Sequence, residues 1–156
     1  MIAAVFYATF YSVNDALIHL LGHVPGADFF RLSSGVKLML VLLTGWVGAA
    51  AIASFCFLWS ALFVFPDHPV LAAQIALAGG TAPWLSCLAF SKHLWPDLST
   101  LNWQTLFQLS LVYAAVNSVL REGILFFYLH DGELLSRVLH AFASDLCGIF
   151  LALYGF

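Results

Sequence analysis

Residues 35–65 read GVKLMLVLLTGWVGAAAIASFCFLWSALFVF, and Lys37 is the one charged side chain among these 31 residues. A helix that crosses the ~30 Å hydrocarbon core of a bilayer needs about 20 apolar residues. As a single helix this run would be about 46 Å long. We therefore expect it either to tilt strongly or to break near Gly45–Gly48 into two half-helices.

The overall composition predicts that the solvent of this chain is lipid. Hydrophobic residues make up 63% of the chain and charged residues 8%, whereas soluble domains carry about 25% charged residues. A soluble chain needs a polar surface, and this one lacks the residues for it. The formal charge of −3 is small and dispersed, which excludes nucleic acid as an expected partner. We predict an integral membrane protein surrounded by the lipid bilayer.

Five stretches are long and apolar enough to cross the membrane. They lack the ten-residue alternation of a β-barrel, so the spans should be helices. The first has no positive charge ahead of its apolar core, which favours a retained helix over a cleaved signal peptide. The predicted fold is an all-α polytopic bundle of five transmembrane helices, or six if the second stretch is broken, in a single domain. The predicted spans are residues 1–21, 35–65, 69–90, 106–129 and 134–156.

The few basic residues predict an orientation, because cytoplasmic connections are enriched in Lys and Arg. Arg31 and Lys37 flank the first connection, and Lys92 and His93 flank the third. The second connection has neither Lys nor Arg. With five spans, this pattern places the N-terminus outside and the C-terminus in the cytoplasm.

Charged residues at membrane depth are the informative part of the sequence. Each costs about 2.5–3.5 kcal/mol at the centre of a span, so five unpaired charges would rival the whole stability of a small protein, about 5–15 kcal/mol. They should therefore face one another, water or a ligand. These residues are Asp15, Lys37, Arg121, Glu122 and Asp145.

Arg121 and Glu122 are neighbours in sequence, so their side chains point about 100° apart on a helix. We expect Arg121 to reach a carboxylate on another helix, and Asp145 is the first choice. Asn117 lies one turn before Arg121 and extends the same polar face. Three interpretations follow for these residues: an ion-pair network that locks the bundle, a site for a ligand, ion or proton, or a contact with a second subunit.

Arg31 and Lys37 are candidates for binding an anionic lipid or ligand. Arg31 precedes the apolar run, where a basic residue acts as an anchor. Lys37 lies inside the run, where snorkelling to the interface competes with pairing to Asp15 or another buried acid.

Histidines provide candidates for metal or haem binding. Asp15, His19 and His23 recur every four residues and share one helix face, and a carboxylate can orient a ligating histidine. His140 is a further candidate ligand. The HLLGH sequence lacks the glutamate of a zinc protease, and neither a nucleophile elbow nor a phosphate loop is present. We expect no enzyme activity and predict no cofactor, with haem or metal binding as a third alternative.

Three passages share a pattern of glycines in apolar helices: RLSSGVKLMLVLLTGWVGAAAIASF (31–55), IALAGGTAPWLSCLAF (75–90) and SDLCGIFLALYGF (144–156). Together, over about residues 31–156, they resemble the bacterial membrane-associated sensor family of the first MASE type. Asp145 and Gly148 match its Asp-x-x-Gly helix. Family members have about eight spans and feed a cytoplasmic kinase or diguanylate cyclase domain, neither of which is expected here. The Trp-Pro that often precedes the first glycine motif is also replaced, by Leu32-Ser33-Ser34. The resemblance implies a fold, a bacterial inner membrane location and a sensing or docking surface.

The short connections predict that function lies within the bilayer. We expect a small non-enzymatic polytopic membrane protein, an accessory or sensor-like subunit of a larger complex that acts through contacts with other integral membrane proteins. The small residues of GWVGAAAIAS (45–54) would suit such helix–helix contacts and complex assembly. The alternative is a carrier or binding protein for an unknown small ligand or ion that uses the buried charges.

Overall fold

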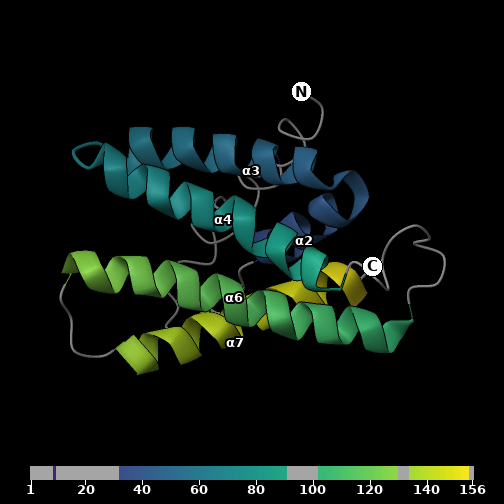
Figure 1. Ribbon diagram of the computed structural model, residues 1–156. Helices are drawn as coiled ribbons and strands as arrows, with labels where there is room; N and C mark the ends of the chain where they lie inside the picture. The colour runs from purple at the N-terminus through teal and green to yellow at the C-terminus, as the bar shows by residue number, and fades with distance from the viewer. Residues whose placement is uncertain (1–8, 10–31, 91–101, 130–133, 155–156) are drawn as a thin grey trace.

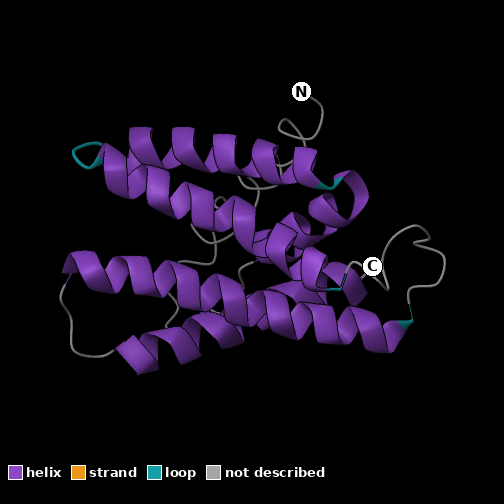
Figure 2. Ribbon diagram, viewed as in Figure 1, coloured by secondary structure: helices purple, strands orange, loops and turns teal. Residues whose placement is uncertain are grey.

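The computed structural model describes Thr9 and residues 32–90, 102–129 and 134–154. Within these ranges the chain is helical apart from short turns, as Figure 2 shows. The all-α prediction is therefore confirmed for the described residues. In chain order the elements are α2 (Leu32–Thr44), α3 (Trp46–Trp59), the π-helical segment η2 (Ser60–Val64), α4 (Pro69–Ala89), α6 (Trp103–Leu129) and α7 (Leu134–Tyr154).

Four helical stretches of the described chain are long and apolar enough to cross a membrane: Trp46–Val64, Pro69–Ala89, Trp103–Tyr128 and Leu134–Leu153. The last three correspond to the predicted third, fourth and fifth spans. α2 is shorter, since its 13 residues extend about 20 Å. The predicted first span, residues 1–21, lies outside the described residues except for Thr9.

The predicted break in the long apolar run occurs at Gly45. Its backbone has φ 62° and ψ −137°, a combination that residues with a Cβ avoid. The Gly45 amide still donates to the carbonyl oxygen of Val41 at 2.8 Å, and the chain then turns into α3. The two parts are unequal, because α2 is short while α3 and η2 together form a 19-residue stretch of spanning length. The alternative of a single tilted helix is wrong.

The helices form two antiparallel pairs with α2 between them (Figure 1). α3 packs along α4, α6 packs along α7, and the pairs meet where α4 contacts α6. α2 packs against α7 and also contacts α3 and α4. Leu38, Val41, Tyr113 and Ile149 are fully buried in the shared core. α2 therefore touches helices of both pairs.

Small residues allow α3 to approach α4 closely, and α2 to approach α7. A Cβ added to Gly80 of α4 would lie 2.6 Å from the Ala49 carbonyl oxygen and 2.8 Å from the Ala53 Cβ of α3. A Cβ added to Gly35 of α2 would lie 2.8 Å from the Gly148 carbonyl oxygen of α7. The small-residue stripe of α3, expected to contact other proteins, is thus occupied at Ala49 and Ala53 by α4 of the same chain.

Candidate functional site at a buried carboxylate

Asp145 lies in the middle of α7 and is 1% exposed. Its two carboxylate oxygens accept hydrogen bonds from two other helices. The Ser34 hydroxyl of α2 donates to Oδ1 at 2.7 Å, and the Asn117 amide of α6 donates from Nδ2 to Oδ2 at 2.6 Å. One carboxylate therefore joins three helices.

Both described hydrogen-bond partners of Asp145 are neutral and buried, since Ser34 is 2% and Asn117 6% exposed. Hydrogen bonds to a charged acceptor are shorter and about twice as strong as those between neutral groups. In a region of low dielectric they strengthen further, while any unmade bond becomes costly. The arrangement can hold a carboxylate at membrane depth without a basic residue in direct contact.

The close approach of α2 and α7 positions the Ser34 hydroxyl. Gly35 follows Ser34 and lies against the backbone of Gly148 and Ile149. Gly148 is one helical turn after Asp145, so it lies on the same face of α7. The absence of a side chain at Gly35 lets the two backbones come near enough for the serine, a short residue, to reach the carboxylate.

The expected ion pair between Arg121 and Asp145 is wrong. α6 and α7 run antiparallel, and the bond from Asn117 to Asp145 fixes their register. Arg121 is one turn beyond Asn117, so it lies about one turn away from Asp145, beside His140 and Ala141 in a groove between the helices. On α6, the residue that bonds Asp145 is Asn117.

Glu122 forms an ion pair with Arg137 across the same two helices. The Arg137 Nε lies 3.2 Å from Glu122 Oε2, and the Glu122 side chain is 6% exposed against 31% for Arg137. This pairing agrees with the expectation that Arg121 and Glu122 cannot satisfy each other. An interhelical ion pair therefore exists, but it uses the next residue of α6 and a residue about two turns before Asp145 on α7.

Lys37 extends from α2 toward the middle of α4. A Cβ placed on Gly79 would lie 3.6 Å from the Lys37 Nζ and 3.8 Å from the Cys56 Sγ of α3. The ammonium group is thus directed into the bundle between α3 and α4. The other predicted partners and ligands, namely Asp15, Arg31, His19 and His23, lie outside the described residues.

Tyr113 is a polar residue of the site that the sequence analysis did not identify. It is fully buried on α6, and within the described ranges its hydroxyl meets the geometry of a hydrogen bond with no other group. Its polar neighbours are Ser34, Asp145 and the thiols of Cys56 and Cys87. The available signal was spacing: Tyr113 precedes Asn117 by four residues and so shares its helix face. We call Ser34, Tyr113, Asn117 and Asp145 the Asp145 cluster.

The groove between α6 and α7 contains the remaining predicted candidate, His140. It has a volume of about 360 Å³ and is lined by basic residues, namely Arg121, Arg137 and His140, together with Glu122. Across the described ranges, no three His, Cys, Asp or Glu residues lie close enough together to hold a metal ion. His140 itself is exposed on α7.

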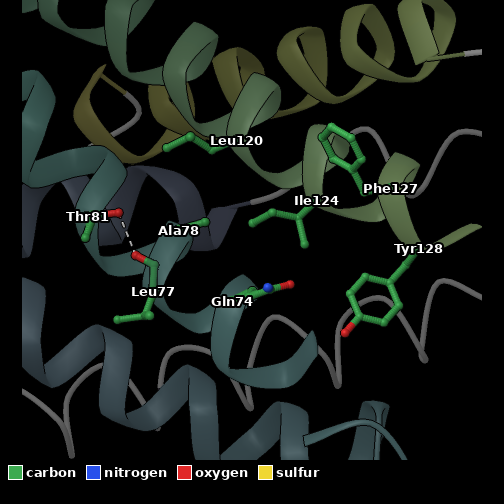
Figure 3. A pocket seen from close by; sticks show the side chains of 8 residues that line it. All are labelled: Gln74, Leu77, Ala78, Thr81, Leu120, Ile124, Phe127 and Tyr128. Carbon is green, nitrogen blue, oxygen red and sulfur yellow. Dashed lines mark hydrogen bonds between the residues drawn. The ribbon is translucent and has the colours of Figure 1, made fainter. Parts of the chain in front are cut away.

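A second groove lies between α4 and α6 (Figure 3). Its volume is about 660 Å³, and its walls include Leu77, Leu120, Ile124 and Phe127. The Thr81 hydroxyl at its edge donates to the Leu77 carbonyl oxygen at 2.7 Å. None of the described residues that line the groove is charged, so it suits a lipid chain or an apolar helix better than a polar ligand.

Comparison of the chain with protein-family models, curated proteins and solved structures found no match. The class of protein is therefore assigned from the fold alone. The described chain is a helical bundle whose four long apolar helices are compatible with a membrane location. Within that bundle, the Asp145 cluster is the most enclosed polar arrangement described.

Proposed function

We propose that this protein is a non-enzymatic, sensor-like accessory subunit of a larger complex in the bacterial cytoplasmic membrane. The Asp145 cluster would couple its helices, and their outer surfaces would contact other integral membrane proteins. In this proposal the C-terminus is cytoplasmic, and the N-terminus is outside if five helices cross.

The observation that supports this proposal is the junction of three helices on one buried carboxylate. Ionisable residues inside a membrane are costly and are more often functional than incidental. A change in the protonation or ligation of Asp145 would alter the contacts of α2, α6 and α7 together. Such a shared contact is what a sensing element needs, because one local event then acts on several helices.

The outer face of α3 supports the second half of the proposal. Trp46, Leu62 and Phe63 are each about two-thirds exposed on α3 and η2. Only 17% of the residues of this span are buried within the chain, against 56% for α4. In a bilayer such a surface contacts lipid or another membrane protein, so it is available for packing against a larger partner.

The resemblance to the membrane-associated sensor family supports the same role. Its three passages fall on α2 with α3, on α4, and on α7, and α2 contacts all the others. Gly35 and Gly148 lie at the contact of α2 with α7, beside the hydrogen-bonded Ser34 and Asp145. The first and third passages therefore contain two residues of the candidate site, Ser34 and Asp145.

A second candidate function is a carrier or binding protein for a small anionic ligand. The position of Lys37 favours it, because its ammonium group lies inside the bundle, near Gly79 and Cys56. Ligand binding would raise the melting temperature in proportion to the logarithm of ligand concentration. We expect this rise to disappear in Lys37→Ala if the candidate is correct, and absence of any ligand-dependent rise would reject it.

Co-purification tests the proposed function. Tagged wild-type protein is extracted from native membranes in a mild detergent after chemical cross-linking, beside Asp145→Asn and the control Asp67→Asn. Asp67 is exposed in the turn before α4, so its substitution changes the same charge outside the cluster. We expect a defined membrane partner with wild type and Asp67→Asn, and its loss with Asp145→Asn. A solitary monomer in all three samples would contradict the proposal.

A further inference from the structure

The groove between α6 and α7 gathers positive charge at one end of the bundle. Its volume is about 360 Å³, and its walls include Arg121 of α6 with Arg137 and His140 of α7. Glu122 is the one acidic side chain among its described walls, and it accepts a hydrogen bond from Arg137 Nε at 3.2 Å. Two guanidinium groups, which stay charged in proteins, thus share the described walls with one carboxylate. Such a groove favours an anion over a cation.

Arg121 is the residue of this groove that needs a counter-charge. The adjacent Glu122 pairs with Arg137, and Asp145 accepts its hydrogen bonds from a serine and an asparagine. Within the described ranges, Arg121 takes part in no ion pair or hydrogen bond. Its guanidinium has five N–H donors, and an unbalanced charge at membrane depth is costly. An anion in the groove would supply both the charge and the acceptors.

The groove lies where, in a bilayer, the hydrocarbon core gives way to the lipid headgroups. α6 ends at Leu129 and α7 begins at Leu134, at the same end of the bundle (Figure 1). The 27 residues of α6 extend about 40 Å, against ~30 Å of hydrocarbon. With this excess shared between its two ends, the Arg121 backbone lies about 7 Å inside the hydrocarbon. From that depth a long arginine side chain reaches the headgroups.

A lipid phosphate is the anion that these walls fit best. A planar guanidinium presents paired N–H donors that match phosphate oxygens, and the exposed Ser136 hydroxyl on the α7 wall is a further donor. Apolar side chains flank these polar groups. Leu125 lines the groove, and Leu135 and Leu139, one turn apart on α7, are 73% and 59% exposed. A free anion would leave these leucines unused, whereas the acyl chains of a lipid would cover them.

We propose that the groove between α6 and α7 binds the phosphate of an anionic phospholipid headgroup, with Arg121 as its principal contact. Arg137, held by Glu122, adds positive charge on the opposite wall. The net positive charge of the described walls selects anionic over zwitterionic headgroups. The site uses neither Asp145 nor Lys37, so it goes beyond the proposed function and does not depend on it.

A thermal-shift titration with lipids tests this inference. The full chain in detergent micelles is heated with increasing phosphatidylglycerol, which is anionic, or phosphatidylcholine, which is zwitterionic. We expect a saturable rise in Tm of several degrees with phosphatidylglycerol and a much smaller one with phosphatidylcholine. In Arg121→Gln the half-saturating concentration of phosphatidylglycerol should increase about tenfold, as expected for loss of a charged contact.

Two further variants separate charge from geometry and position. Arg121→Lys should titrate between wild type and Arg121→Gln, because lysine holds a phosphate only as a single point charge. His68→Gln changes an exposed basic side chain in the turn before α4, outside the groove, and should titrate like wild type.

Three results would overturn the inference. Equal Tm rises with both lipids would show a general effect of lipid. A saturable rise with inorganic phosphate alone, and none with phosphatidylglycerol, would assign the groove to a free anion. An unchanged phosphatidylglycerol titration in Arg121→Gln would place the lipid elsewhere; this variant should fold, because the native side chain bonds to no described residue. Retention of the membrane partner in Asp145→Asn would count against the proposed function alone and leave this site unaffected.

Discussion

Asp145 accepts hydrogen bonds from a hydroxyl and an amide, which carry no charge. Two arginines are nevertheless close along the helices: Arg121 lies one turn after Asn117 on α6, and Arg137 lies two turns before Asp145 on α7. The physical reason is reach. Ser34 and Asn117 have short side chains whose polar atoms arrive at the carboxylate without leaving the core. Because each bond ends on a charged acceptor in a low-dielectric interior, two such bonds hold the group in place.

Removal of the Ser34 donor should destabilise the bundle. Ser34→Ala leaves Oδ1 of Asp145 without its hydrogen bond, at an expected cost of about 1–3 kcal/mol in the free energy of unfolding. The matched control is Ser54→Ala, since the exposed Ser54 hydroxyl donates only to the Ala50 carbonyl oxygen of its own helix at 2.8 Å. Unfolding in detergent micelles should show a loss for Ser34→Ala and almost none for Ser54→Ala. Equal effects would place Ser34 outside the cluster.

The adjacent glycines of α4 offer a second test at the scale of single residues. Both Gly→Ala changes gain about 1 kcal/mol of helix propensity. At Gly79 the new Cβ would meet its nearest neighbour at 3.6 Å, an ordinary contact, whereas at Gly80 it would lie 2.6 Å from the Ala49 carbonyl oxygen. We expect Gly79→Ala to keep or raise the melting temperature, and Gly80→Ala to lower the unfolding free energy by about 1–3 kcal/mol. The reverse order would contradict the close packing of α3 on α4.

The short α2 is the element that brings Ser34 to Asp145. It packs on α7 while remaining covalently joined to α3 of the other helix pair. The length of the apolar run predicted either a strong tilt or a break, because 31 residues exceed what one span requires. The expectation was two half-helices, whereas the part after Gly45 alone reaches spanning length, because 20 of the 31 residues follow Gly45.

Gly45, the residue that joins α2 to α3, should tolerate substitution poorly. Gly45→Ala places a Cβ at φ 62°, which costs about 1–3 kcal/mol when the backbone keeps that conformation. Gly123→Ala is the control, because a Cβ there meets nothing within 4 Å. Thermal unfolding should show a clear loss for Gly45→Ala and no loss for Gly123→Ala. An unaffected Gly45→Ala protein would mean that α2 and α3 can form one continuous helix.

At the scale of the whole molecule, composition was enough to predict helices, and run length narrowed the second stretch to a strong tilt or a break near Gly45–Gly48. The candidate site was only partly predictable. Asp145 and Asn117 were identified because polar residues are conspicuous in an apolar helix. The identity of their partners depends on the register of α6 against α7 and on the close approach at Gly35, which are contacts between distant parts of the chain. Tyr113 went unnoticed because an aromatic residue in an apolar helix is ordinarily part of the core.

The central claim is that Asp145 joins α2, α6 and α7 through neutral partners. A double-mutant cycle tests it most directly, with unfolding free energies measured for Asp145→Ala, Asn117→Ala and the double variant, beside the same cycle with Arg121→Ala. The account predicts a coupling of about 1 kcal/mol between Asp145 and Asn117, and additivity within about 0.5 kcal/mol for Asp145 with Arg121. Additivity for Asn117 together with strong coupling for Arg121 would contradict it.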